Sequence, residues 1–176
     1  MTTSRILLAA LAAGATASAV GIGSIAASAD GGASHASASI VDATGTEVGF
    51  AKFTEDASGT VHVNVKVNGI TPGEHGIHIH AVGACSPTFA AAGGHHNPLA
   101  APHGDHAGDL PNLIVNVAGN GRLNATTDHA TLSPGALSVF DADRAALVIH
   151  ALPDDFVTQP TGGSGDRIAC GVIVAD

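Results

Sequence analysis

Histidine is the residue type best placed to support chemistry in this 176-residue chain. There are eleven histidines, against six lysines and arginines together. Ten of the eleven lie beyond residue 60, and seven lie between His75 and His106. Because imidazole is a common metal ligand and titrates near neutral pH, this density indicates a metal site before any other kind of site.

Two of these histidines, His78 and His80, alternate with isoleucine. In a β-strand, residues i and i+2 project from the same face about 6.5–7 Å apart, so two imidazoles can lean together and share one metal ion. Ile79 would then point into a core on the opposite face. Taken alone, the pair also fits two solvated histidines on an edge strand.

A second group, formed by His95, His103, His106 and Asp109, falls within fifteen positions of irregular sequence. Three nitrogen donors and one carboxylate suit a closed tetrahedral zinc site, and a loop without its own apolar core needs such a cross-link to stay ordered. The alternative is a disordered, metal-scavenging loop. The Gly-Gly, Asn-Pro and Gly-Asp-Leu sequences within 93–110 indicate specified turns instead.

One further histidine, His150, ends the apolar run 146–149. A polar residue at this place often marks only the point where a strand meets water. It would belong to a metal site if it faced His78 and His80.

The elements that must position these residues are short strands. Residues 60–67 alternate valine with polar residues, which is the period of a half-buried strand. Two irregular loops, about 83–111 and 154–166, interrupt the pattern. Further strands are predicted at about 37–41, 48–54, 76–82, 112–117, 123–129, 145–150 and 168–174. Gly-rich turns between strands and the lack of helical periodicity predict an all-β sandwich or barrel.

The N-terminal segment has the order of a secretory signal peptide. Arg5 is the only charge in 1–29, an apolar run follows it, and Ala-Ser-Ala at 27–29 fits a signal peptidase site. A membrane anchor is the alternative, but Gly, Ser and Thr interrupt the run. We therefore predict a cleaved signal at 1–29, a flexible arm at 30–36 and one folded domain at 37–176, in a protein that is secreted or extracytoplasmic.

The predicted mature domain is acidic and carries two cysteines. Without Arg5, five basic residues face fifteen acidic ones, which argues against nucleic acid or an anionic membrane as a partner. In an exported chain, the even pair of Cys85 and Cys170 predicts a disulfide.

Four segments resemble the motifs of the copper/zinc superoxide dismutase family of secreted bacterial type. They are GIHIH at 76–80, HHNP at 95–98, HGDHAGDL at 103–110 and GDRIACGVI at 165–173. The similarity runs from about residue 36 to 175, with the motifs in the family's order and at compatible spacing. It implies an eight-stranded antiparallel Greek-key β-barrel with two long functional loops, and it is compatible with a homodimer.

The resemblance also implies roles for individual residues. Copper would be held by His78, His80, His95 and His150, and zinc by His95, His103, His106 and Asp109, with His95 bridging both metals as imidazolate. His75 would support the copper strand, Asp154 would orient one ligand of each metal, Arg167 would stand beside the open copper position, and Cys85 would pair with Cys170 within the subunit.

The implied activity is superoxide dismutation, in which two superoxide ions and two protons become oxygen and hydrogen peroxide. Copper takes imidazole ligands and cycles by one electron, whereas zinc would be structural. The segment 151–166 carries acidic residues and no lysine or arginine. We therefore expect the anion to be attracted by the metals and Arg167, with Lys52, Lys66 and Arg144 as further candidates.

Superoxide dismutation has two alternatives. A non-enzymatic extracytoplasmic copper- and zinc-binding protein could use the same scaffold. Loss of His95, His150 or Arg167 would favour it, and all three are present. A zinc hydrolase is disfavoured because four protein ligands would leave zinc no open position.

Overall fold

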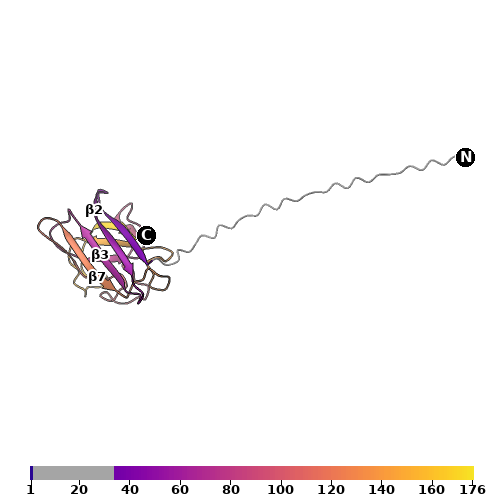
Figure 1. Ribbon diagram of the computed structural model, residues 1–176. Helices are drawn as coiled ribbons and strands as arrows, with labels where there is room; N and C mark the ends of the chain where they lie inside the picture. The colour runs from indigo at the N-terminus through magenta and orange to yellow at the C-terminus, as the bar shows by residue number, and fades with distance from the viewer. Residues whose placement is uncertain (2–33) are drawn as a thin grey trace.

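The computed structural model describes residues 34–176 together with Met1, so the predicted signal peptide and residues 30–33 of the predicted arm lie outside the described residues. The described part is all-β, as predicted (Figure 1). Its strands are β1 (His35–Asp42), β2 (Glu47–Glu55), β3 (Val61–Val67), β4 (Gly73–His75), β5 (Ile77–His80), β6 (Leu113–Val115), β7 (Gly121–Thr127), β8 (Ala146–His150), β9 (Arg167–Val172) and β10 (Val174–Ala175), with one 3-10 turn, η1 (Phe89–Ala92).

Ten strands are present in the described residues where the resemblance implied eight. The difference lies at Gly76, which separates β4 from β5, and at Ile173, which separates β9 from β10. Each pair continues one extended run that changes its partner: β4 pairs with β6 and β5 with β8, while β9 pairs with β8 and β1, and β10 with β1 alone. Counted as runs, the eight-stranded prediction agrees with the structure.

The change of partner at Gly76 nearly closes the sheet into a barrel. The strands follow the order β4-β6-β7-β3-β2-β1-β9-β8-β5, so the two strands that flank Gly76 stand at opposite ends of the sheet. The Gly76 N–H donates to Leu152 O and the His150 N–H donates to Gly76 O, both at 2.8 Å. The pairing of β3 with β7 across the chain has the Greek-key form of long-range connection.

Period-two patterns place the core inside this barrel. All four valines of β3 are buried, and the residues between them are exposed, as the sequence predicted. Phe53 on β2 and Ile40 on β1 are at most 1% exposed and belong to the same apolar cluster. Within residues 34–176, no helix is long and apolar enough to cross a membrane.

The strands β5 and β8 differ from β3 because both of their faces are buried. Leu147 and Ile149 of β8 join Ile77 and Ile79 of β5 in the barrel core. The opposite face of β8 begins with Ala146 and Val148, which form a second small cluster with Ala92 and Cys170. That opposite face, covered by loops, is where the histidines lie.

Strand ends agree with prediction to within a few residues. β1 begins at His35, inside the arm predicted at 30–36, because residues 35–37 pair with β2. β7 begins at Gly121 and ends at Thr127, two residues earlier at each end than predicted, and exposed His129 falls in the following bend.

Candidate metal centre

The strand β5 carries His78 and His80 on the face opposite Ile77 and Ile79, and both histidines are fully buried. They are paired with Val148 and Ala146 of β8, so these residues share a face across the two strands. Two residues beyond Val148, His150 lies on that same face. The structure therefore places His150 beside His78 and His80. From the sequence, His150 belonged to a metal site only if it faced these two residues.

The first loop, 81–112, covers these histidines by lying directly against β5. The Ile79 N–H donates to Gly108 O, and the His96 N–H donates to Ile79 O, both at 2.8 Å. A side chain at Gly108 would overlap the Ile79 carbonyl oxygen, so only glycine permits this approach. The contact brings Asp109 opposite His78 and His95 opposite His80 as isolated antiparallel bridges.

Two side-chain clusters result, and they share His95. The His78 cluster comprises His78, His80, His95 and His150, and the Asp109 cluster comprises His95, His103, His106 and Asp109. In each cluster the ligand atoms lie within 4.8 Å of one another. These are the two sets that the sequence and the resemblance predicted.

Hydrogen bonds to carbonyl groups orient two rings of the His78 cluster. His80 donates from Nδ1 to Gly93 O at 3.0 Å, and His150 donates from Nδ1 to Gly165 O at 3.2 Å. In a neutral imidazole the other nitrogen then carries a lone pair. The Nε2 atoms of His80 and His150 face each other at 3.3 Å, so a cation between them would satisfy two acceptors that cannot satisfy each other.

The carboxylate of Asp154 links the two clusters. It accepts from His78 Nε2 at 2.6 Å and from His103 Nε2 at 2.9 Å, and the Asp154 and His78 side chains are fully buried. Each histidine therefore has its Nδ1 free to face a metal ion. Burial alone raises the pKa of Asp154, but bonds from His103, the Phe156 N–H and His78 outweigh it and lower that pKa.

Three buried nitrogens in the described part of the chain have no hydrogen-bond partner: His78 Nδ1, His95 Nε2 and His103 Nδ1. Buried polar atoms are usually paired, and an unpaired one costs free energy. All three atoms belong to the clusters. In each ring, the other nitrogen donates a hydrogen bond to the carboxylate of Asp154 or Asp109. The residues present therefore fit metal ions.

Burial keeps three imidazoles of the His78 cluster, those of His78, His80 and His150, in the form that binds a metal. Burial, followed by the nearby histidines, lowers the pKa of His78 to about 3, of His80 to about 2 and of His150 to about 4. Contacts with Asp154 and with carbonyl oxygens oppose this shift without reversing it. These rings are neutral at neutral pH, which is the ligating state.

The Asp109 carboxylate organises its own cluster. Oδ1 accepts from His95 Nδ1 at 2.8 Å, and Oδ2 accepts from the Gly104 and His106 N–H groups at 2.8 and 3.1 Å. Oδ2 also lies 3.3 Å from His103 Nδ1. Burial raises the pKa of Asp109, but these hydrogen bonds and the neighbouring histidines bring it below its usual range.

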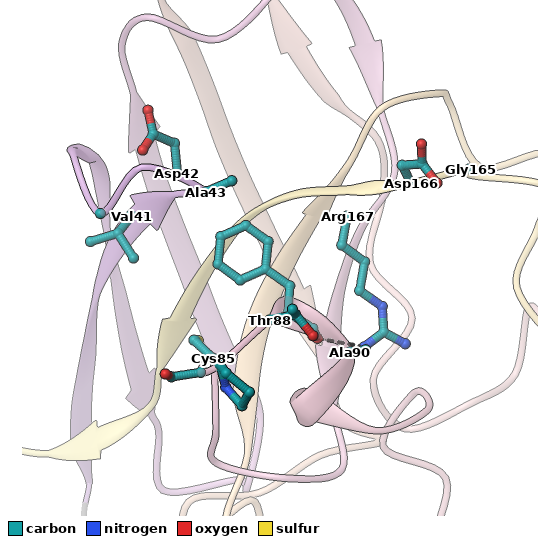
Figure 2. Close-up of a pocket in the computed structure, with 13 residues that line it drawn as sticks. Val41, Asp42, Ala43, Cys85, Thr88, Ala90, Gly165, Asp166 and Arg167 are labelled. Carbon is teal, nitrogen blue, oxygen red and sulfur yellow. Dashed lines mark hydrogen bonds between the residues drawn. The ribbon is translucent and has the colours of Figure 1, made fainter.

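Arg167 begins β9 and points towards the segment around η1, as Figure 2 shows. Its guanidinium donates to Phe89 O at 2.7 Å and to Gly93 O at 2.5 Å. Gly93 O also accepts a hydrogen bond from His80, so this one carbonyl oxygen links Arg167 to the His78 cluster. Arg167 and Asp166 also line a cleft of about 790 Å³.

Three other predicted residues lie beside the clusters. The structure contains the disulfide between Cys85 and Cys170, with Cα atoms 5.8 Å apart, so the predicted bridge is confirmed and joins the first loop to β9. His75 is buried, and its ring nitrogens lie 2.8 Å from His150 O and Thr71 O. It therefore contacts the His78 cluster through the main chain of His150.

The candidate steering lysines lie away from the clusters. Lys52 on β2 and Lys66 on β3 are exposed on the outer face of the barrel, and β1 and β9 separate β2 from β8 in the sheet. Sequence reasoning could not place them, because strand order is not visible in local periodicity.

Sequence reasoning also missed two carboxamides in the site. Asn112 exchanges two hydrogen bonds with the main chain of Asp154, at 2.9 and 3.0 Å, and Gln159 binds the main chain of His103. Neither residue type is a usual metal ligand. The one available signal was their position in or beside the two irregular loops.

Comparisons with known proteins agree with this geometry. The family model described as copper/zinc superoxide dismutase matches residues 47–173. The chain is 40% identical over 147 residues to superoxide dismutase [Cu-Zn] 2 of Aquifex aeolicus, covering 78% of this chain and 85% of the relative. It is 38% identical over 170 residues to superoxide dismutase [Cu-Zn] of Deinococcus radiodurans, covering 86% and 91%.

Solved structures give the same family likeness. A superoxide dismutase-like protein from Bacillus subtilis superposes with a TM-score of 0.74 at 35% identity, covering 78% of this chain and 97% of that one. The Cu/Zn superoxide dismutase from Brucella abortus superposes with a TM-score of 0.64 at 31% identity, covering 78% and 98%.

Proposed function

The chain belongs to the copper/zinc superoxide dismutase family, and we propose that it converts two superoxide ions and two protons to oxygen and hydrogen peroxide outside the cytoplasm. One observation carries the proposal: two buried clusters of metal-ligating atoms share a single residue, His95. A shared ligand couples a redox metal to a structural metal, whereas two independent storage sites would not need one.

The donors indicate which metal each cluster would hold. The His78 cluster offers four imidazole nitrogens, a set that suits copper, and the Asp109 cluster offers three imidazoles and a carboxylate, a set typical of zinc. Copper would supply one-electron redox chemistry when bound. Zinc would cross-link the first loop, which has only the 3-10 turn η1 as regular structure.

Two residues of the chain would serve the reaction directly. Arg167 presents a fixed positive charge beside the His78 cluster, where an anionic substrate would be stabilised. His95 holds Asp109 through Nδ1, while its Nε2 has no hydrogen-bond partner in the described residues, so Nε2 is the atom able to hold and release a proton.

A second candidate function is metal binding without catalysis. It is raised by one relative whose name is only superoxide dismutase-like, a protein of Bacillus subtilis that is 36% identical over 146 residues. The complete His78 cluster together with Arg167 supports the enzyme instead, because metal carriage alone needs no cation beside the copper site.

Metal analysis combined with a superoxide-decay assay tests this function. We expect about one copper and one zinc per chain and rapid superoxide decay, as the ligand sets imply. Copper without zinc would contradict the two-metal site, and full metal content without superoxide decay would favour the metal-binding protein.

Export of the protein is part of the same proposal. The disulfide between Cys85 and Cys170 supports an oxidising compartment. N-terminal sequencing of the protein recovered from the medium should begin at Asp30, and an intact N-terminus at Met1 would contradict cleavage at 27–29.

A further inference from the structure

Gln159 contacts the main chain of His103 with both ends of its carboxamide. The His103 N–H donates to Gln159 Oε1 at 2.7 Å, and Gln159 Nε2 donates to His103 O at 3.3 Å. Gln159 lies on the second loop, 151–166, and His103 lies on the first. The contact therefore joins the two loops through residues that are 56 positions apart in sequence.

This contact satisfies the main chain where the first loop provides no partner of its own. Asp109 Oδ2 accepts from the N–H groups of Gly104 and His106, the neighbours of His103 on its C-terminal side. Among the described residues, Gln159 is the partner of both the N–H and the carbonyl of His103. The main chain of this residue is therefore held from the second loop.

The second loop also holds the His103 ring. Asp154, five positions before Gln159, accepts from His103 Nε2 at 2.9 Å. A side chain at Gly162 would overlap both the Asp154 carboxylate and the His103 ring, so the loop packs closely around this residue. Because the main chain and Nε2 of His103 are both held by the second loop, the orientation of the ring is set. Its Nδ1, which has no hydrogen-bond partner among the described residues, then faces the Asp109 cluster.

We propose that Gln159 is a positioning residue for zinc. It holds the backbone of His103 so that Nδ1 faces the other ligand atoms of the Asp109 cluster. The inference rests on the proposed assignment of zinc to the Asp109 cluster. Gln159 itself ligates nothing. It also donates to Val157 O at 3.2 Å within the second loop, and it acts on the Asp109 cluster through His103. Partners that orient a metal ligand typically contribute 10–100-fold to metal affinity.

Cobalt titration of the metal-free full-length mature protein tests the proposal, because Co²⁺ in a tetrahedral site absorbs visible light. We expect Gln159→Ala to weaken Co²⁺ binding at this cluster by about 10–100-fold and to alter its visible spectrum. Copper binding by the His78 cluster should be unchanged. Gln159→Glu keeps the acceptor for the His103 N–H and loses the donor to the His103 carbonyl. The Co²⁺ affinity of this variant should therefore lie between those of the parent and of Gln159→Ala.

Asn97→Ala is the matched control. Asn97 binds the Ala101 N–H and carbonyl, both at 2.9 Å, which is the same kind of contact made to a residue that is not a ligand. It should lower thermal stability without changing the Co²⁺ spectrum. If Gln159→Ala bound Co²⁺ as tightly as the parent, or if Asn97→Ala weakened binding equally, Gln159 would have no positioning role. Failure of the parent protein to bind Co²⁺ would instead overturn the proposed zinc site.

Discussion

At the scale of single residues, the function depends on which ring nitrogen carries the proton. His80 and His150 donate from Nδ1 to carbonyl groups, whereas His78 and His103 donate from Nε2 to Asp154. Each acceptor leaves the opposite nitrogen free, and the free nitrogens converge in the two clusters. The ligating atoms are therefore selected by carbonyl and carboxylate acceptors that a list of ligands would omit.

Replacement of Arg167 should separate the enzyme from a metal carrier. We expect Arg167→Ala to keep both metals and to lower the dismutation rate about tenfold or more, and Arg167→Glu to lower it further by reversing the local charge. Stopped-flow superoxide decay measures both. Higher ionic strength should narrow the gap between the variants, since screening acts beyond about 10 Å at 0.1 M salt.

Two controls accompany that experiment. Arg122→Glu makes the same change of net charge on the exposed face of β7 and should leave the rate near that of the parent. Arg167→Lys keeps the charge but changes the geometry of the bonds to Phe89 and Gly93. Wild-type activity in Arg167→Glu at full metal content would show that another cation serves the substrate.

The metal-free protein should lose stability as the pH falls. Burial lowers the pKa of His78, His80 and His150 to about 3, 2 and 4, whereas in the unfolded chain they titrate near 6.5. Between those limits the unfolded state binds more protons, so the free energy of unfolding falls as the pH drops from about 7 towards 4. Urea unfolding at several pH values measures this slope.

A free energy of unfolding that stays constant between about pH 7 and 4 would show that the three buried histidines titrate alike in both states.

At the scale of elements, the site depends on β5 being covered on both faces. Its isoleucines pack in the barrel core, and its histidines lie beneath the first loop. The main-chain bonds of Ile79 to that loop fix the distance between strand and loop. The metal clusters therefore form where a loop is held against a strand almost as a further strand would be.

Gly108→Ala should break this approach. The added methyl group would meet the Ile79 carbonyl, so we expect a loss of about 1–3 kcal/mol in the free energy of unfolding and reduced zinc content. Gly94→Ala is the matched control in the same loop, because a Cβ there meets nothing within 4 Å. Denaturant unfolding and metal analysis of both variants test the prediction, which fails if the two behave alike.

At the scale of the whole molecule, the barrel separates an exposed outer face on β2, β3 and β7 from the loops that cover the metal clusters at β5. The outer face of β2, β3 and β7 carries exposed lysines and an arginine, whereas the first loop is hydrogen-bonded to Ile79 of β5 and the second loop reaches His78 of β5 through Asp154. The formal net charge of the chain is −9, so in the proposed function the local charge of Arg167 and of the bound metals would attract the anionic substrate against the overall field.

The disulfide ties the first loop to the barrel. The double variant Cys85→Ser with Cys170→Ser should lose about 2–5 kcal/mol of unfolding free energy. It should also lower activity, because the tied segment carries the Phe89 and Gly93 carbonyls that hold Arg167. Urea unfolding measures the first effect. Two titratable thiols in unreduced protein from the medium would contradict the bridge.

The sequence by itself determined the fold class, the faces of β3 and β5, the pairing of His78 with His80 on one face, and the composition of the Asp109 cluster. These features are local: side chains alternate with a period of two along any strand, and a ligand type is a property of one residue. Motif order added the family, and with it His150 and Arg167 as members of the site.

Only the tertiary structure decided how these residues meet. His150 joins His78 because β8 pairs with β5 in one register, and Arg167 lies by the site because it shares the Gly93 carbonyl with His80. Gln159 reaches His103 across two loops. Contacts of this kind depend on strand pairing and loop closure over tens of residues, and neither leaves a periodic trace in the sequence.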